Sequence, residues 1–261
     1  MKTRLAMLAA LVVLAGLAFM QAEERKKLAL STEINTAVTP MLKLEKDGYG
    51  WEERHDEIMR IKNEIDPEIV LIGDSITHFW GGKPDGGRIG NRGTETWESL
   101  FGKRRVLNLG FGWDRTQNAL KRIELGELDG LKPKAIVIHI GTNNTAQTEN
   151  CRSNTPEEIA AGIGAIVEQC QKKCPGAKVI VMAIFPRGKM ADNPKRAELA
   201  KINAVLAAAQ KDKPGVTYLD ITDKWLEPDG SISKEVMPDS LHPNQKGYGV
   251  WAEALKAVLP E

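Results

Sequence analysis

The sequence contains little cysteine and little histidine. Its 261 residues include three cysteines and four histidines, and no Cys–His cluster has the spacing of metal ligands. The sequence therefore indicates no metal site. Cys170 and Cys174 stand one helical turn apart, where their Cβ atoms are too distant for a relaxed disulfide. We expect these two thiols to remain unbridged, although fraying of the helix before Pro175 would allow a bridge.

An excess of charge of either sign is also absent. With 36 basic and 35 acidic residues, the formal net charge is +1. Nothing in this balance favours nucleic acid or an anionic membrane surface as a partner, so we expect no nucleic-acid binding. The chain length and the 42% of hydrophobic residues suffice for one sizeable α/β domain.

The chain has one long hydrophobic run, which lies at its N-terminus. The rest of the sequence has none. A basic start precedes an apolar stretch over residues 5–20, which ends among small residues. This pattern predicts a signal peptide over residues 1–22, cleaved after Ala18 or Ala22. The protein would then be secreted or periplasmic, with no membrane span after cleavage. The alternative is an uncleaved N-terminal anchor, against which the shortness of the run argues.

Strand-like and helix-like segments alternate along the rest of the chain. Apolar β-branched runs predict five strands, at residues 69–73, 105–110, 134–140, 178–184 and 216–221. Amphipathic patterns and capping residues predict helices at 51–65, 94–101, 114–124 (capped by Asp114), 155–173, 195–211 and 244–259. Residues 23–47 are predicted to be an extended lead-in, and residues 48–261 the domain. Such alternation predicts a parallel sheet with helices on both faces.

Gly73-Asp74-Ser75 follows the first predicted strand and opens a helix-like segment. Ligands of open α/β sheets bind at the carboxyl ends of the strands. A serine in the first turn of a helix exposes its hydroxyl, and its free N–H can face a developing oxyanion. Ser75 is therefore the candidate nucleophile, and a helix N-cap is its alternative role. Asp74 is expected to support the turn rather than to take part in chemistry.

A nucleophilic serine needs a base, which the scarcity of histidine lets us seek by elimination. His55 falls on a polar helix and is expected to face solvent. His78 is so close to Ser75 on one helix that it could not easily also meet an outside acid. His139 lies within a buried strand and is expected to be a core residue. His242 is the remaining candidate.

The surroundings of His242 suit a base. Pro243 keeps it out of the helical conformation, immediately before a predicted helix N-terminus that disfavours the protonated ring. Asp239, three residues earlier, can accept a hydrogen bond from one ring nitrogen and leave the other for the serine. Asp220 and Asp223 are the rival partners, but the spacing favours Asp239.

Two further groups could stabilise an oxyanion together with the N–H of Ser75. Gly110 ends the second predicted strand, where the lack of a Cβ lets a backbone N–H approach a ligand closely. Asn143 follows the third strand and offers a side-chain amide, and Asn144 could share or take that role.

Four blocks of the chain resemble those of the SGNH (GDSL-type) hydrolases. They are Gly73-Asp74-Ser75, Asn108-Leu109-Gly110, Gly141-Thr142-Asn143 and Asp239-Ser240-Leu241-His242. Within that superfamily the chain is most similar to the catalytic subunits of platelet-activating-factor acetylhydrolase Ib and their bacterial relatives. That closer resemblance runs from about residue 50 to 258 and rests on Gly126-Glu127-Leu128, Gly141-Thr142-Asn143-Asn144, Pro186-Arg187-Gly188 and Leu241-His242.

The resemblance implies a flavodoxin-like three-layer α/β/α sandwich with a five-stranded parallel sheet, and no cofactor or metal. It also implies roles for the candidate residues: Ser75 as nucleophile, His242 as base and Asp239 as its partner. Gly110 and Asn143 would join the Ser75 N–H in the oxyanion hole. Analogy with the acetylhydrolase subunits suggests a homodimer.

We expect a secreted serine esterase that hydrolyses short-chain, acetyl esters on carbohydrate through an acyl-enzyme. A phospholipid, lysophospholipid or platelet-activating-factor-like ester is the alternative substrate, and a non-catalytic carbohydrate-binding module is the alternative of another class. The glycine-rich loop 81–93 and residues 111–116 are expected to shape the cleft. Trp80 and Trp113 either line a sugar or acyl pocket or are buried. Arg187 either contacts a substrate anion or caps a surface loop.

Overall fold

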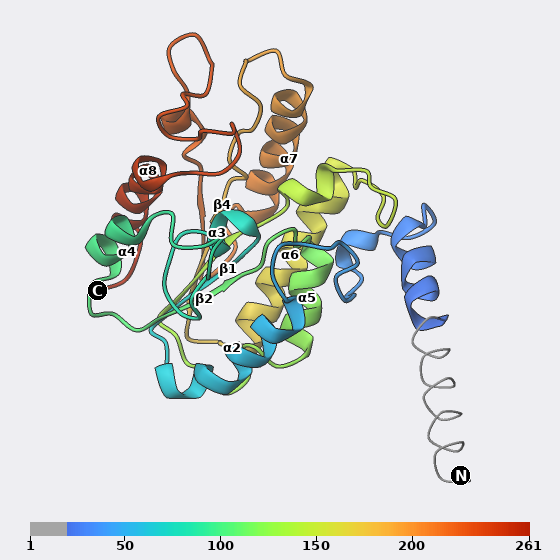
Figure 1. Cartoon of the computed structure of the whole chain (residues 1–261), viewed down its shortest axis with the longest axis horizontal. Coiled ribbons are helices and arrows are strands. Elements are labelled where there is room, and N and C mark those ends of the chain that lie inside the picture. Colours follow the sequence, from blue (N-terminus) through green and yellow to red (C-terminus); the bar gives the residue numbers. More distant parts are fainter. Residues whose placement is uncertain (1–19) are drawn as a thin grey trace.

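The computed structural model describes residues 20–261 (Figure 1). Most of the predicted signal peptide, including the Ala18 cleavage site, lies outside the described residues. Residues 20–30 are helical, and a short 3-10 turn, η1, spans Thr36–Val38. The prediction of an extended lead-in over residues 23–47 was therefore wrong in its first part. The Glu, Arg, Lys, Leu and Ala residues concentrated there are strong helix formers.

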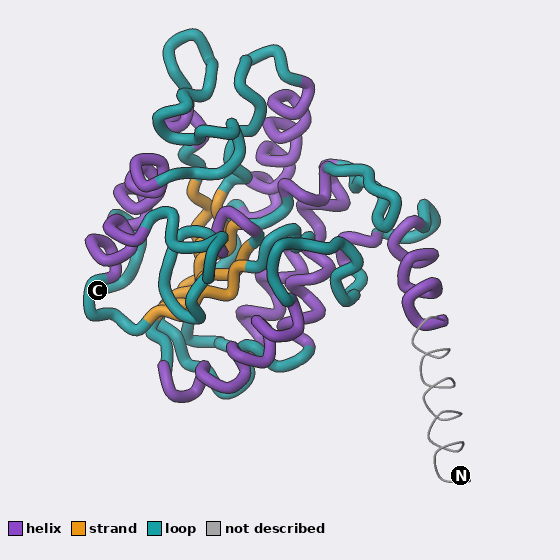
Figure 2. The backbone as a smooth tube through the Cα atoms, in the orientation of Figure 1, coloured by secondary structure: helices purple, strands orange, loops and turns teal. Residues whose placement is uncertain are grey.

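Five parallel strands form one sheet in the order β2-β1-β3-β4-β5, which confirms the predicted sheet. Figure 2 shows the strands at the centre of the molecule with helices around them. The strands are β1 Ile69–Gly73, β2 Val106–Gly110, β3 Ala135–His139, β4 Lys178–Met182 and β5 Val216–Leu219. Every residue of β1, β2 and β3 is buried, as expected for parallel strands covered on both faces.

Helices cover both faces of the sheet, so the chain forms the expected three-layer sandwich. Alternate residues of each strand point to opposite faces. Val70 and Ile72 of β1 join one hydrophobic cluster, and Ile69 and Leu71 join the other. The first cluster packs under α2 Trp51–Ile65, α5 Thr116–Glu124, α6 Pro156–Lys173 and α7 Pro194–Gln210. The second packs under α3 Ser75–His78, α4 Thr94–Phe101 and α8 Gln245–Lys256.

Two glycines at the ends of neighbouring strands let α3 pack directly against those strand ends. Gly73 and Gly110 are partners in the register of β1 and β2. A Cβ on Gly110 would lie 2.2 Å from the backbone nitrogen of His78, and one on Gly73 would lie 2.5 Å from the carbonyl oxygen of His139. No larger residue fits at either position, so these glycines set the place of α3 and of its first residue, Ser75.

The helix after β2 begins later than predicted. Arg115, not Asp114, is the N-cap of α5, and Asp114 instead closes a turn by donating its N–H to the carbonyl of Phe111 at 3.1 Å. The three cysteines are free thiols, so the expectation that Cys170 and Cys174 are unbridged is confirmed. Within residues 20–261, no helix is both long enough and apolar enough to cross a membrane.

Candidate active site

A hydrogen-bonded chain of three side chains lies at the carboxyl end of the sheet. The hydroxyl of Ser75 is 2.9 Å from Nε2 of His242, and Nδ1 of the same ring is 2.7 Å from Oδ2 of Asp239. Ser75 and His242 are 167 positions apart in the sequence. The structure thus brings together the three residues predicted as nucleophile, base and orienting acid.

One carboxylate both closes the loop before α8 and orients the histidine ring. Oδ1 of Asp239 accepts the backbone N–H groups of Leu241 at 3.0 Å and His242 at 2.7 Å, while Oδ2 faces the ring. Burial opposes ionisation, but these hydrogen bonds outweigh it and hold the pKa of Asp239 below its usual value. The rival Asp220 instead caps the N–H of Thr222.

The surroundings of His242 favour the neutral form of its ring. Burial lowers its pKa below 6.5, and the hydrogen bond and charge of Asp239 offset only part of that effect. With Nδ1–H donated to the carboxylate, Nε2 is left to accept the hydroxyl proton of Ser75. The ring of Phe79 packs against the imidazole, with the centroids 5.1 Å apart.

Asn143 has an amide N–H to spare for a ligand, whereas Asn144 does not. Asn143 lies on the 3-10 turn η2 Thr142–Thr145 and donates from Nδ2 to the carbonyl of Asp114 at 3.0 Å, and its second N–H has no acceptor among residues 20–261. Asn144 is fully buried, and its amide contacts three acceptors and one donor on neighbouring segments. Its side chain links those segments.

Gly110 has a backbone N–H that is already engaged. It donates to Oδ1 of Asn108 at 2.8 Å, while the Asn108 amide group donates to the carbonyls of Thr77 and Gly81. Asn108 is completely buried. In the structure, Gly110 allows α3 to approach β2 closely. To bind an oxyanion, its N–H would have to leave Oδ1 of Asn108.

Asp74, and not Ser75, is the N-cap of α3, and through this cap it supports the turn as expected. Its Oδ1 accepts the N–H of Ile76 at 3.0 Å, and its Oδ2 has no hydrogen-bond partner within the described part of the chain. The carboxyl group is completely buried, and burial raises its pKa to about 7 despite the hydrogen bond from Ile76.

Replacement of Asp74 by asparagine is expected to change how stability depends on pH. The folded-state pKa lies above the ordinary value of 3.8, so the folded protein holds a proton that the unfolded chain releases. The stability from this group is therefore fully present below about pH 4 and lost as pH rises through about 7, with a slope of up to about 1.4 kcal/mol per pH unit. Asp74→Asn keeps the Oδ1 acceptor and should be the more stable protein at pH 8.

Urea unfolding at pH 5 and pH 8 measures this difference. Asp220→Asn is the matched control, because Asp220 is exposed and also caps a backbone N–H through Oδ1. The control should keep the pH dependence of the wild type. Identical pH dependence in Asp74→Asn and wild type would contradict the prediction.

The other three histidines serve the structure. His139 is buried in β3 and accepts the N–H of Phe185 at 3.3 Å, which confirms its expected place in the core. His78 is also buried and accepts the N–H of Gly112 at 3.3 Å. Burial lowers the pKa of His139 to about 3 and that of His78 to about 2. The prediction that His55 faces solvent was wrong, because its side chain is only 13% exposed.

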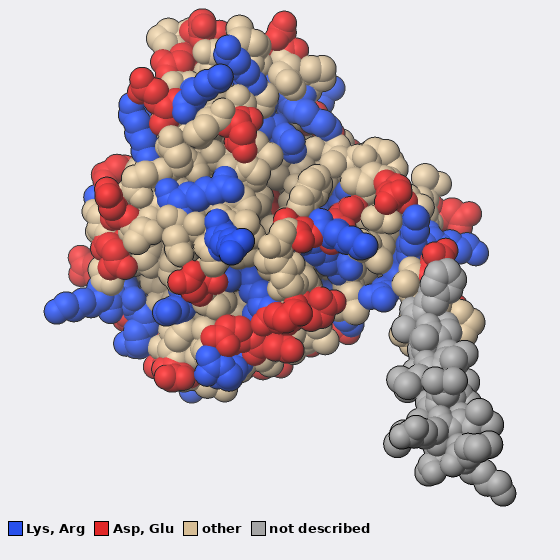
Figure 3. Space-filling model, viewed as in Figure 1, with Lys and Arg blue, Asp and Glu red and all other residues tan. Residues whose placement is uncertain are grey.

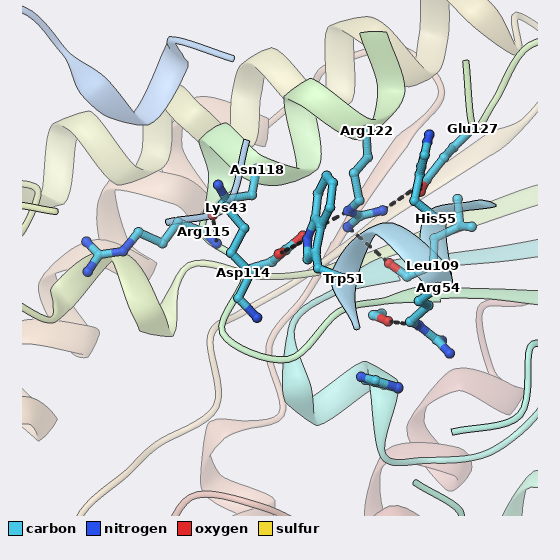
Figure 4. Close-up of polar contacts among 12 residues, drawn as sticks. Lys43, Trp51, Arg54, His55, Leu109, Asp114, Arg115, Asn118, Arg122 and Glu127 are labelled. Atoms are coloured by element: carbon cyan, nitrogen blue, oxygen red, sulfur yellow. Dashed lines mark hydrogen bonds and ion pairs between the residues drawn. The ribbon is translucent and has the colours of Figure 1, made fainter. Parts of the chain in front are cut away.

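His55 belongs to a buried ionic network that the sequence did not indicate (Figure 4). Its Nδ1 is 2.8 Å from Oε1 of Glu127, and the other carboxylate oxygen of Glu127 pairs with Arg122. Arg122 also donates from Nε to Oδ2 of Asp114 at 2.8 Å, and Trp51 donates from its indole to Oδ1 of Asp114 at 2.9 Å. The side chains of Arg122, Asp114 and Glu127 are all fully buried.

Cationic side chains also hold the backbone carbonyls at the end of β2. Arg54 donates to the carbonyls of Asn108 at 3.0 Å and Gly110 at 2.9 Å, and Lys43 donates to that of Gly112 at 2.7 Å. These hydrogen bonds hold the turn after β2 in place. The backbone carbonyl of its last residue, Asp114, accepts a hydrogen bond from the side-chain amide of Asn143. The sequence analysis named Glu127 as part of a resemblance, and His55 and Asp114 in other roles, but it predicted none of these contacts.

The remaining candidate residues from the sequence differ in their burial and contacts. Trp80 is completely buried and stacks on Trp251, so the packing alternative holds for it. Trp113 is 41% exposed. Arg187 is partly buried and donates to the hydroxyl of Thr142 at 3.3 Å, next to Asn143. Among residues 20–261 no group of three or more His, Cys, Asp or Glu side chains is placed to hold a metal ion.

The fold is that of the SGNH (GDSL-type) hydrolases. A GDSL-like lipase from Bacteroides thetaiotaomicron superimposes with a TM-score of 0.59 at 16% identity, covering 78% of this chain and 98% of that chain. The acetylxylan esterase Axe2 from Geobacillus stearothermophilus superimposes with a TM-score of 0.56 at 19% identity, covering 74% and 94%. At such identities the likeness shows the fold alone.

The sequence itself establishes the family. Residues 71–250 match the GDSL-like Lipase/Acylhydrolase family, and the chain belongs to it. It is 34% identical over 221 residues to platelet-activating factor acetylhydrolase IB subunit alpha1 from Rattus norvegicus, covering 85% of this chain and 87% of the relative. The protein is therefore a carboxylic ester hydrolase, and the resemblance seen in the sequence is confirmed.

Proposed function

We propose that the protein is a serine esterase that removes short acyl groups, acetyl in particular, from carbohydrate through an acyl-enzyme. The hydrogen-bonded chain of Ser75, His242 and Asp239 carries the proposal. A neutral imidazole within 2.9 Å of a hydroxyl, with its other nitrogen bound to a carboxylate, is the arrangement that activates a serine nucleophile.

In the proposed reaction His242 takes the hydroxyl proton as Oγ of Ser75 attacks the ester carbonyl. The N–H of Ser75 and the second amide N–H of Asn143 then stabilise the oxyanion, and Gly110 joins them if its N–H exchanges Asn108 for the oxyanion. The protonated ring of His242 gives its proton to the leaving alcohol. A water molecule, deprotonated by the same ring, then hydrolyses the acyl-enzyme.

Carbohydrate is the favoured alcohol for two reasons. A tryptophan is exposed on the turn after β2, and a solved structure of the same fold is titled an acetylxylan esterase. The identity with acetylhydrolase subunits supports the second candidate, an ester of a phospholipid, lysophospholipid or platelet-activating-factor-like lipid. The assembled Ser75–His242–Asp239 chain argues against a binding module without catalysis, since binding alone does not require it.

Export and assembly belong to the same proposal. The basic and apolar start of the chain supports secretion or transport to the periplasm. Figure 3 shows acidic and basic side chains interspersed over the face in view. A homodimer is proposed by analogy with the acetylhydrolase subunits.

A substrate panel combined with active-site labelling tests the proposal. We expect para-nitrophenyl acetate to be turned over faster than the butyrate and octanoate esters, and acetylated xylan to release acetate. A fluorophosphonate should label one residue, Ser75, as located by peptide mass spectrometry. Folded protein that neither turns over any ester nor takes the label would favour the binding module. Faster release of acetate from platelet-activating factor than from xylan would favour the lipid substrate.

A further inference from the structure

Trp113 differs from the other tryptophans of the chain in its exposure. The side chain is 41% exposed, whereas the other five tryptophans, all within the described residues, are between 0% and 7% exposed. An indole left in water forgoes the large stabilisation that burial of this side chain brings. Its exposure therefore needs an explanation other than stability.

The backbone of Trp113 is also unfavourable for a bulky residue. It is the third residue of the turn from Phe111 to Asp114, and its φ angle is 61°. The third position of a turn with a positive φ prefers glycine, because a side chain is strained there. Tryptophan at this position thus costs folding free energy in the backbone as well as in the side chain.

The turn that carries Trp113 borders the candidate active site. The N–H of Phe111 donates to the carbonyl of Gly73 at 3.0 Å, two residues before the candidate nucleophile. The carbonyl of Asp114 accepts the amide of Asn143 at 3.0 Å. In the chain, Trp113 therefore lies between a residue bonded to Gly73 and a residue bonded to Asn143.

The same turn is rigidly held at Gly112. Its N–H donates to Nδ1 of His78 at 3.3 Å, and its carbonyl accepts Nζ of Lys43 at 2.7 Å and the hydroxyl of Tyr49 at 3.1 Å. An exposed aromatic on a rigid support loses little conformational entropy when it binds a ligand. The backbone that carries the exposed indole is therefore held in a defined place next to the candidate active site.

We propose that Trp113 is the stacking platform for a pyranose ring of the substrate, a specificity subsite that rests on the proposed esterase function. An indole face offers a flat apolar surface of the size of a sugar ring, with a polar N–H at its edge. The ring that stacks on it belongs to the alcohol part of the ester, so the contact acts on KM rather than on the chemical step. Ser75 would then act on an acetyl group carried near that ring.

Two substitutions separate the indole from the backbone strain. Trp113→Gly removes both, and Trp113→Ala removes the indole but keeps a Cβ at positive φ. For both variants, the ratio of kcat/KM on acetylated xylo-oligosaccharide to that on para-nitrophenyl acetate should fall about 10-fold, mainly through KM. Trp113→Gly should melt no lower than the wild type, because the strain is relieved. Asp212→Gly, at another positive φ of 58° far along the chain, is the control and should keep the wild-type ratio.

Direct binding is measured by fluorescence in the full-length Ser75→Ala background, where no turnover occurs. Since the other tryptophans are buried, acrylamide quenching reports mainly on Trp113. Acetylated xylo-oligosaccharide should protect this fluorescence from acrylamide, and Trp113→Ala should abolish the protected component.

These outcomes test the Trp113 subsite separately from the esterase function. Absence of protection, or an unchanged substrate ratio in both variants, overturns the subsite even if para-nitrophenyl acetate is hydrolysed normally. Protection by lysophospholipid but not by the oligosaccharide overturns it in favour of a lipid contact. Failure of the wild type to hydrolyse any ester overturns the function, while protection by the sugar would still show the subsite.

Discussion

Ser75→Ala is expected to lower kcat on para-nitrophenyl acetate by about 10⁴–10⁶-fold. The hydroxyl that is 2.9 Å from Nε2 of His242 is removed, so no acyl-enzyme can form and only the remaining hydrogen-bond donors of the site act. KM should change little, because the hydroxyl group adds little to binding of the ground state. Steady-state kinetics, with circular dichroism to verify the fold, measure the effect.

Ser99→Ala is the matched control for this substitution. Ser99 is an exposed serine on α4, and its replacement should leave kcat and the melting temperature near the wild-type values. His242→Gln should approach the loss seen with Ser75→Ala, because in the proposed mechanism both residues act as one unit. Esterase activity of Ser75→Ala at the wild-type level would show that another residue is the nucleophile.

Arg122→Met is expected to produce the largest loss of stability, about 3–5 kcal/mol in the free energy of unfolding. Arg122 is the shared partner of Asp114 and Glu127, and all three side chains are fully buried. Methionine can fill much of the volume, but it leaves two buried carboxylates without their common cation. Urea unfolding at pH 7 measures the loss.

An exposed pair of the same residue types provides the control. Arg60 and Glu57 form an ion pair on α2 in which the side chains are 66% and 42% exposed. Arg60→Met should change the stability far less, because water screens and solvates the remaining carboxylate. Equal losses in Arg122→Met and Arg60→Met would mean that burial does not set the strength of the Arg122 network.

The sheet and the three central site residues were predictable because their signals are local. Strand periods, caps and breakers are written in adjacent residues, and parallel strands necessarily bring their carboxyl ends to one edge. Ser75 follows such an end, and Asp239 and His242 share one tight loop, so short spacings were enough to indicate their hydrogen bond.

The ionic network could not be predicted in the same way. Arg122 and His55 lie on amphipathic helices. On such a helix the sequence pattern predicts that a charged residue faces solvent, unless its partner is known. Their partner Glu127 comes from a separate turn, and His55 and Glu127 are 72 positions apart. The hydrogen bond from the N–H of Gly110 to Oδ1 of Asn108 joins residues only two positions apart, but the sequence did not indicate it, because the orientation of the Asn108 side chain depends on the carbonyls of Thr77 and Gly81 that its amide contacts.

The sequence alone therefore determined the class of fold, the order of its elements and the residues of the serine–histidine–acid chain. Only the tertiary structure decided which polar groups are buried, which N–H groups stay available, and that one tryptophan of six stands exposed on a strained turn. The physical reason is the distance along the sequence over which each interaction acts. Backbone propensity and capping act between neighbours, whereas burial and hydrogen-bond pairing depend on segments that meet only after the chain has folded.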